Sequence, residues 1–109
     1  MKYLMIVCFD PTVDPADATG GMDIDAWCAE MDGRGVRLEG RALDQSDATT
    51  VRVRGGETLI SDGPFAETKE FMVGYDMLDC KNLDEAIEVA ALIPGAKSGS
   101  VEVRPIWEM

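Results

Sequence analysis

Histidine is absent from this sequence. Imidazole is the general base of Ser-His-Asp and Cys-His centres and a common metal ligand. Its absence therefore excludes those two kinds of centre, metal sites built on imidazole and a haem ligated by histidine. The three cysteines, Cys8, Cys28 and Cys80, are widely spaced and form no C-x-x-C pair. Their odd number indicates reduced thiols rather than a disulfide framework. Because the chain also has no phosphate loop, zinc pattern or dinucleotide fingerprint, we expect neither a metal nor a cofactor.

Basic residues are scarce as well. The 10 lysines and arginines are outnumbered by 21 aspartates and glutamates, which gives a formal net charge of −11. Such a surface repels phosphate groups, so we expect no direct binding to nucleic acid or to an anionic membrane. No apolar run approaches the roughly 20 residues that span a bilayer. The first run, YLMIVCF, lacks the basic lead and cleavage site of a signal peptide, and we expect a cytoplasmic protein.

The chain length of 109 residues suits a single domain over positions 1–109. Within it, residues 1–9 and residues 71–78 are apolar on both alternating faces. A strand of this kind is covered above and below. Both runs are therefore predicted to be inner strands of a sheet.

Two helices are indicated by apolar side chains at helical spacing. The stretch IDAWCAEM places them at i, i+3, i+4 and i+7, and Asp23 precedes it as a suitable N-cap. The stretch NLDEAIEVAALIPG starts at Asn82 as N-cap, with Glu85 completing a capping-box pattern and Pro-Gly ending the helix. The segment DPTVDPADATGG, which has two prolines and two glycines, is predicted to be a loop.

Further strands are predicted between and after these elements. Short alternating runs on either side of Gly55 and Gly56 (TVRVR and ETLIS) indicate a β-hairpin. In the closing SVEVRPIWE, Pro105 cannot donate a ladder hydrogen bond and indicates an edge strand or a bulge. Residues 36–43 alternate, with one face made of Val36, Leu38, Gly40 and Ala42 and the other of Arg37, Glu39 and Arg41.

The order of elements is β-α-β, a hairpin, then β-α-β. This order predicts an α+β fold, a ferredoxin-like βαββαβ sandwich with an inserted β-hairpin, in which two helices pack on one face of an antiparallel sheet. Two helices cannot cover both faces of strands that are apolar on each side. The simplest cover for the second face is the same face of another copy, so we expect a homodimer through the sheet faces.

The stretch SDGPFAETKE (residues 61–70) is the candidate functional segment, because it joins two predicted strands through a turn and a cluster of charges. Asp62, Gly63 and Pro64 are typical turn residues, and this interpretation is favoured because turns far outnumber catalytic loops. In the alternative interpretation, Asp62 is a partly buried carboxylate that acts as general acid or base. Phe65 either anchors the loop to the core or stacks on a ligand.

Glu67 and Lys69 would point the same way if the segment is extended, so they are the charges best placed to face a cleft together. In such a site Asp62 or Glu67 would move a proton. Lys69 or Arg104 would hold a negatively charged group, and Asp62 with Arg104 is the preferred pair. Gly63, Pro64 and Phe65 would contact the ligand.

Arg52, Arg54 and Arg104 are notable cations in an acidic chain. Cross-strand pairing with Glu57, Glu102 or a similar residue is the favoured interpretation. The alternative is a local positive spot that clamps a carboxylate ligand with bidentate geometry.

The stretches DGPFAETKE and GSVEVRP, in register with both predicted helices, resemble a known family. Over residues 36–106 the chain is similar to the YCII-related proteins of the DGPF branch, and residues 1–10 fit the first strand of that family. The resemblance implies a dimeric α/β barrel of ferredoxin-like subunits. It also implies a link to extracytoplasmic-function sigma factors, which many DGPF members accompany.

What the resemblance implies about activity is narrower. Elsewhere in the YCII group a His-Asp pair in the cleft is the proposed catalytic centre, and some relatives are lyases or isomerases of small cyclic acids. This chain has no histidine to match that pair, so it is left open whether the protein is an enzyme at all.

Three functions follow from these observations. The first is a small-molecule-binding protein, or a weak lyase or isomerase, with a pocket for a small organic acid between helices and sheet and near the DGPF stretch. The second is a non-enzymatic accessory or regulatory dimer that acts on a protein such as a sigma factor. The third is an inactive relative that retains the fold.

Overall fold

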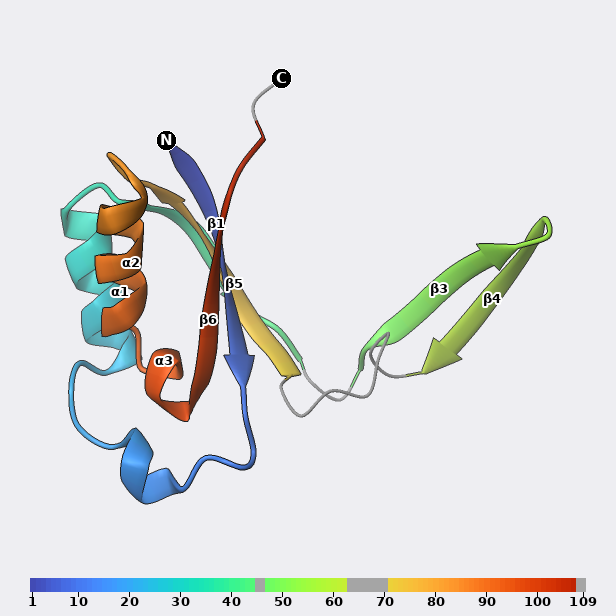
Figure 1. Ribbon diagram of the computed structural model, residues 1–109, viewed down its shortest axis with the longest axis horizontal. Helices are drawn as coiled ribbons and strands as arrows, with labels where there is room; N and C mark the ends of the chain where they lie inside the picture. The colour runs from blue at the N-terminus through green and yellow to red at the C-terminus, as the bar shows by residue number, and fades with distance from the viewer. Residues whose placement is uncertain (45–46, 63–70, 108–109) are drawn as a thin grey trace.

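The computed structural model describes residues 1–44, 47–62 and 71–107 (Figure 1). Its class is α+β with antiparallel sheets, as predicted. Within these residues, no helix has the length and apolar character needed to cross a bilayer. In chain order the elements are β1 (Lys2–Phe9), the 3-10 helix η1 (Pro15–Ala18), α1 (Ile24–Gly33), β2 (Arg37–Ala42), β3 (Thr49–Arg54), β4 (Glu57–Asp62), β5 (Phe71–Asp79), α2 (Leu83–Leu92), α3 (Gly95–Ser98) and β6 (Gly99–Pro105).

Four strands form one sheet in the order β2-β5-β1-β6, and every neighbouring pair is antiparallel. β1 and β5 are the inner strands, which confirms the prediction from their two apolar faces. β6, which ends at Pro105, lies at an edge, also as predicted. α1 and α2 lie on the same side of the sheet (Figure 1). This arrangement is compatible with a ferredoxin-like fold.

The core lies between this sheet and the two helices. Tyr3 and Met5 of β1 are 2% and 0% exposed, and Trp27 of α1 is 0% exposed. The indole Nε1 of Trp27 donates to the carbonyl oxygen of Val89 in α2 at 3.0 Å. That carbonyl lies in the last turn of α2, where a helix leaves acceptors without an internal donor. The indole therefore fastens α1 to α2 while its ring fills the core.

Both long helices begin at their predicted N-caps. The Asp23 side chain accepts from the N–H of Ala26 at 2.8 Å, and the Asn82 side chain accepts from the N–H of Glu85 at 3.0 Å. Ile24 departs from the predicted apolar stripe, because its side chain is 50% exposed. It lies at the mouth of a cavity. The predicted loop before α1 contains the single 3-10 turn η1.

β3 and β4 form a separate two-stranded sheet around Gly55 and Gly56. Both glycines have positive φ, 58° and 79°, as a two-residue hairpin turn of type I′ requires. In Figure 1 the hairpin stands away from the four-stranded sheet. Every residue of β4 is exposed.

The predicted alternation of residues 36–43 is wrong, and the reason is a β-bulge in β2. Arg37 pairs with Leu78, whereas Glu39 pairs with Met77 and Gly40 with Asp76, so Leu38 is an extra residue. An extra residue shifts the period of a strand by one. Arg37 therefore shares the helix-facing side of the sheet with Gly40, opposite to the prediction, and Leu38 is 50% exposed.

Candidate functional site

The structure does not bring together the preferred pair of predicted site residues. Asp62 ends β4 in the two-stranded sheet, whereas Arg104 lies in β6 of the four-stranded sheet. No hydrogen bond or ion pair joins them within the described chain. The Nε of Arg104 instead lies 2.7 Å from Oε1 of Glu102. Arg104 thus pairs with Glu102, one of the predicted partners, but within β6 rather than across two strands.

Five predicted site residues, Gly63, Pro64, Phe65, Glu67 and Lys69, lie outside the described residues. Their roles stay predictions.

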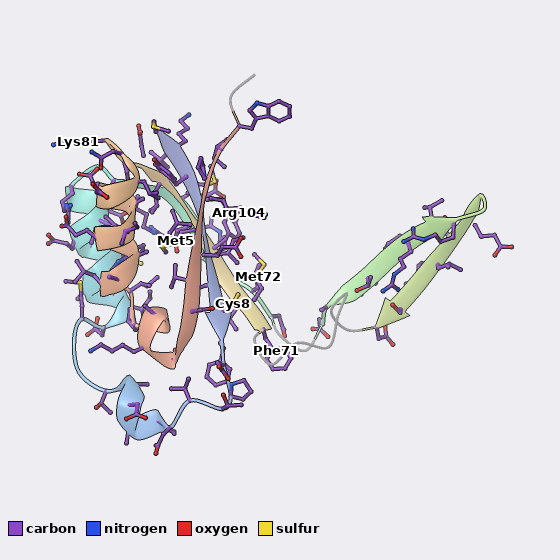
Figure 2. All side chains as sticks on the ribbon, in the orientation of Figure 1. Met5, Cys8, Phe71, Met72, Lys81 and Arg104 are labelled. Carbon is purple, nitrogen blue, oxygen red and sulfur yellow. The ribbon has the colours of Figure 1, made fainter. Side chains whose placement is uncertain are left out.

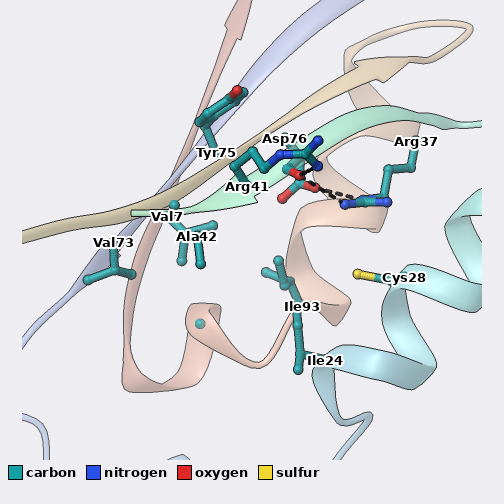
Figure 3. Close-up of a pocket in the computed structure, with 13 residues that line it drawn as sticks. Val7, Ile24, Cys28, Arg37, Arg41, Ala42, Val73, Tyr75, Asp76 and Ile93 are labelled. Carbon is teal, nitrogen blue, oxygen red and sulfur yellow. Dashed lines mark hydrogen bonds and ion pairs between the residues drawn. The ribbon is translucent and has the colours of Figure 1, made fainter. Parts of the chain in front are cut away.

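A cavity of about 210 Å³ lies between α1, the end of α2 and the helix-facing side of the sheet (Figure 3). Its position agrees with the predicted pocket between helices and sheet, but Asp62 does not line it. Most of the wall is apolar, and the polar side chains in it come from α1, β2 and β5. The lining residues are Val7, Ile24, Cys28, Arg37, Gly40, Arg41, Ala42, Val73, Gly74, Tyr75, Asp76, Ile93 and Gly95.

Asp76 is the carboxylate of this cavity and is only 7% exposed. Arg37 fixes it, because Nε donates to Oδ1 of Asp76 at 2.8 Å. The same guanidinium donates from Nη1 to Oδ1 of Asp32 at 3.2 Å and from Nη2 to the carbonyl of Gly40 at 3.4 Å. Three acceptors thus orient one guanidinium group, and the guanidinium in turn holds the carboxylate of Asp76 at the wall of the cavity.

Irregularities in two strands create this geometry. The bulge at Leu38 places Arg37 on the face of Asp76, as described above. In β5, Val7 pairs with Gly74 and Cys8 with Met72, so Val73 is an extra residue that lines the cavity.

Gly40 supplies the space for the carboxylate. A Cβ at this position would collide with the carboxyl group of Asp76 and with the guanidinium that holds it. A side chain at position 40 would therefore displace the ion pair. In this chain the bulge brings Arg37 to the site, and the glycine opposite leaves room for Asp76.

Burial raises the pKa of Asp76 above its ordinary value of 3.8, and the hydrogen bond and charge of Arg37 counteract only part of that rise. The neighbouring carboxylate of Asp32 raises the pKa of Asp76 a little further. A raised pKa brings a carboxyl group closer to the range in which it can both accept and donate a proton.

The thiol of Cys28 also lines the cavity, but its pKa is raised, chiefly by burial. A thiol of raised pKa stays protonated and is a poor nucleophile. Within the described residues, no group of three acidic or sulfur side chains is arranged to hold a metal ion.

Sequence reasoning missed Arg37 and Asp76. Residues 71–78 were interpreted only as an apolar inner strand, although Asp76 is the one charged residue in that run. A carboxylate at a predicted buried position is itself a signal, because an unpaired charge there is costly. Its partner could not be named in advance, because Arg37 reaches it only through the bulge.

Comparisons with known proteins relate this chain to a family and to a curated protein. The model of the YCII-related domain matches residues 1–109. A curated relative, "Uncharacterized protein R00369" from Rhizobium meliloti (strain 1021), is 46% identical over 68 residues, which cover 61% of this chain and 55% of that protein. The chain thus matches about half the length of this relative, and its printed name assigns no activity.

Proposed function

The chain belongs to the family of proteins with a YCII-related domain, and from this premise we propose that it binds a small organic acid beside Asp76 and exchanges a proton with it. The observation that carries the proposal is a nearly buried carboxylate, fixed by an arginine, in the wall of a mostly apolar cavity. Proton transfer of this kind is the chemistry of a weak lyase or isomerase. It needs no cofactor.

The hydrogen bonding of Asp76 leaves one oxygen for a ligand. Arg37 occupies Oδ1, and no donor to Oδ2 is present within the described residues. Those residues contain no fully buried side-chain oxygen without a partner, so Oδ2 is accessible, and Asp76 belongs to the lining of the cavity. A ligand C–H or O–H group in the cavity could therefore approach this oxygen directly. The acid-base centre predicted at Asp62 and Glu67, in residues 61–70, is a different proposal, because Asp62 does not line this cavity.

We expect the carboxyl group of Asp76 to titrate with a midpoint above 3.8. The folded protein then holds this proton more tightly than the unfolded chain does. The contribution of Asp76 to stability is therefore greatest below 3.8 and falls as the pH rises through the folded midpoint. Carbon-13 NMR of the aspartate carboxyl groups measures the midpoint, and the resonance that disappears in Asp76→Asn identifies it. A midpoint at or below 3.8 would contradict the raised pKa of Asp76 that suits this carboxyl group to accept and donate a proton.

We also propose that two chains pack with their sheets face to face, as a dimeric α/β barrel of ferredoxin-like subunits with the hairpin as an insertion. Leu4, Ile6 and Met77 support this, because they lie on the side of the sheet away from α1 and α2 and are only half-buried. In Figure 2, Met72 and Arg104 project from this side, whereas Met5 points toward the helices.

Sedimentation equilibrium is expected to give the mass of two chains. Ile6→Glu is expected to give one, because it would place a carboxylate in the apolar contact. The control is Ile87→Glu, the same change at a half-exposed position on α2, and it should remain a dimer. A wild-type protein with the mass of one chain at micromolar concentration would contradict this assembly.

The second candidate function is a non-enzymatic accessory or regulatory dimer that contacts a protein such as an extracytoplasmic-function sigma factor. The hairpin favours it, since Val51, Val53 and Ile60 share one face and are 60%, 60% and 69% exposed. Contiguous exposed apolar side chains are typical of protein-binding surfaces. A sigma-factor complex that survives Asp76→Asn but is lost in Val53→Ser would favour this function over the first.

A further inference from the structure

Arg41 differs from the other arginines near the helices and the sheet. In the described part of the chain, Arg34, Arg37 and Arg104 each form an ion pair with a carboxylate. Arg41 forms none there. Its Nη1 donates only to the carbonyl oxygen of Gly40, at 2.9 Å.

The charge of Arg41 is unmatched in the cavity. Arg41 and Asp76 both line the cavity (Figure 3), and no ion pair joins them in the described part of the chain. Arg37 is already matched, because it contacts both Asp76 and Asp32. Arg41 is therefore a cation in the cavity lining that no carboxylate contacts within the described residues, in a chain whose net charge is −11. An anionic group placed there would gain a charge-assisted hydrogen bond.

The rest of the wall restricts the remainder of the ligand. Aliphatic side chains dominate it, namely those of Val7, Ile24, Ala42, Val73 and Ile93. The volume of about 210 Å³ lies below the usual 300–1,000 Å³ of ligand sites, which indicates a compact molecule. A second negative charge would face the carboxylate of Asp76 and be repelled.

We infer that Arg41 binds the carboxylate of a compact monocarboxylic acid whose apolar body fills the cavity. The inference rests on the proposed function and names the residue that recognises the acid. With the carboxylate held by Arg41, the carbon skeleton lies on the side of Asp76, where a proton can be exchanged. Arg41 is thus a specificity residue, and Asp76 is the residue that reacts.

The test compares benzoate, its uncharged analogue benzamide and inorganic phosphate as probes. Methyl resonances of Val73 and Ile93 report binding in the cavity, and each titration gives a dissociation constant. We expect wild-type protein to bind benzoate about tenfold more tightly than benzamide, and phosphate not to shift these methyl groups. Arg41→Gln should bind both aromatic probes equally. Arg104→Gln, which removes the same charge from the exposed pair with Glu102, should keep the tenfold preference.

The outcomes separate this inference from the function on which it rests. The role of Arg41 is overturned if benzoate and benzamide bind wild-type protein equally, or if Arg41→Gln still binds benzoate more tightly than benzamide. The proposed function at Asp76 is not affected by either result. If Arg41→Gln removes the preference while Asp76→Asn leaves proton exchange unchanged, the role of Arg41 stands and the catalytic proposal fails. If neither aromatic probe shifts the methyl groups, both are overturned.

Discussion

Asp76→Asn is expected to slow proton exchange of a bound ligand by about a hundredfold to ten-thousandfold, the usual contribution of a positioned general base. In the step considered, a C–H bond next to a carbonyl group breaks. Its electron pair stays on the ligand as an enolate, and the proton moves to Oδ2 of Asp76. An amide has nearly the same shape as the carboxyl group but cannot accept this proton.

Deuterium exchange measures this step without knowledge of the natural substrate. Small keto acids such as levulinate are incubated with the protein in D2O, and proton NMR follows the loss of the signal next to the carbonyl group. Asp62→Asn is the matched control, because it makes the same change at an exposed position of β4. If Asp62→Asn stops the exchange and Asp76→Asn does not, the catalytic centre lies in residues 61–70, as predicted from the sequence, instead of at Asp76.

Much of the fold could be predicted from the sequence because its signals are local. Asp23 and Asn82 cap helices through hydrogen bonds to residues three positions later, a relation visible in the sequence itself. The Gly55-Gly56 turn is equally local. The inner positions of β1 and β5 followed from composition, because strands covered on both sides are apolar on both sides.

The candidate site could not be predicted in the same way, because it depends on the pairing of distant strands. Arg37 and Asp76 are far apart in the chain and meet only because Leu38 is an extra residue in β2. No local pattern marks that bulge, and strict alternation puts Arg37 on the wrong face. The sequence signal of the charges in residues 61–70 is also stronger than that of a single aspartate inside an apolar strand.

The second large expected effect is the loss of stability on removing Arg37, the ion-pair partner of Asp76. Arg37→Met should destabilise the protein by about 3 kcal/mol at pH 7, because it leaves a nearly buried carboxylate without its counter-ion. Because Oδ2 is accessible from the cavity, the expected loss of stability is at the lower end of the range for breaking a buried ion pair. Arg104→Met breaks an ion pair that is more than half exposed and should cost no more than about 1 kcal/mol. Urea unfolding at a fixed chain concentration measures both.

The pH dependence distinguishes a lost ion pair from lost packing. Arg37 lowers the pKa of Asp76, so its removal raises that pKa further. The variant then holds the proton of Asp76 more tightly when folded than when unfolded. Its deficit should be full above the new folded midpoint and shrink as the pH falls toward 3.8, where the carboxyl group becomes neutral in both states. The double variant Arg37→Met with Asp76→Asn should recover part of the loss at pH 7, because no charge remains to be matched. An equal loss of stability at pH 7 and at pH 4 would mean that Arg37 stabilises the fold through its packing alone. Asp76 would then not be the carboxyl group of raised pKa on which the proposed chemistry depends.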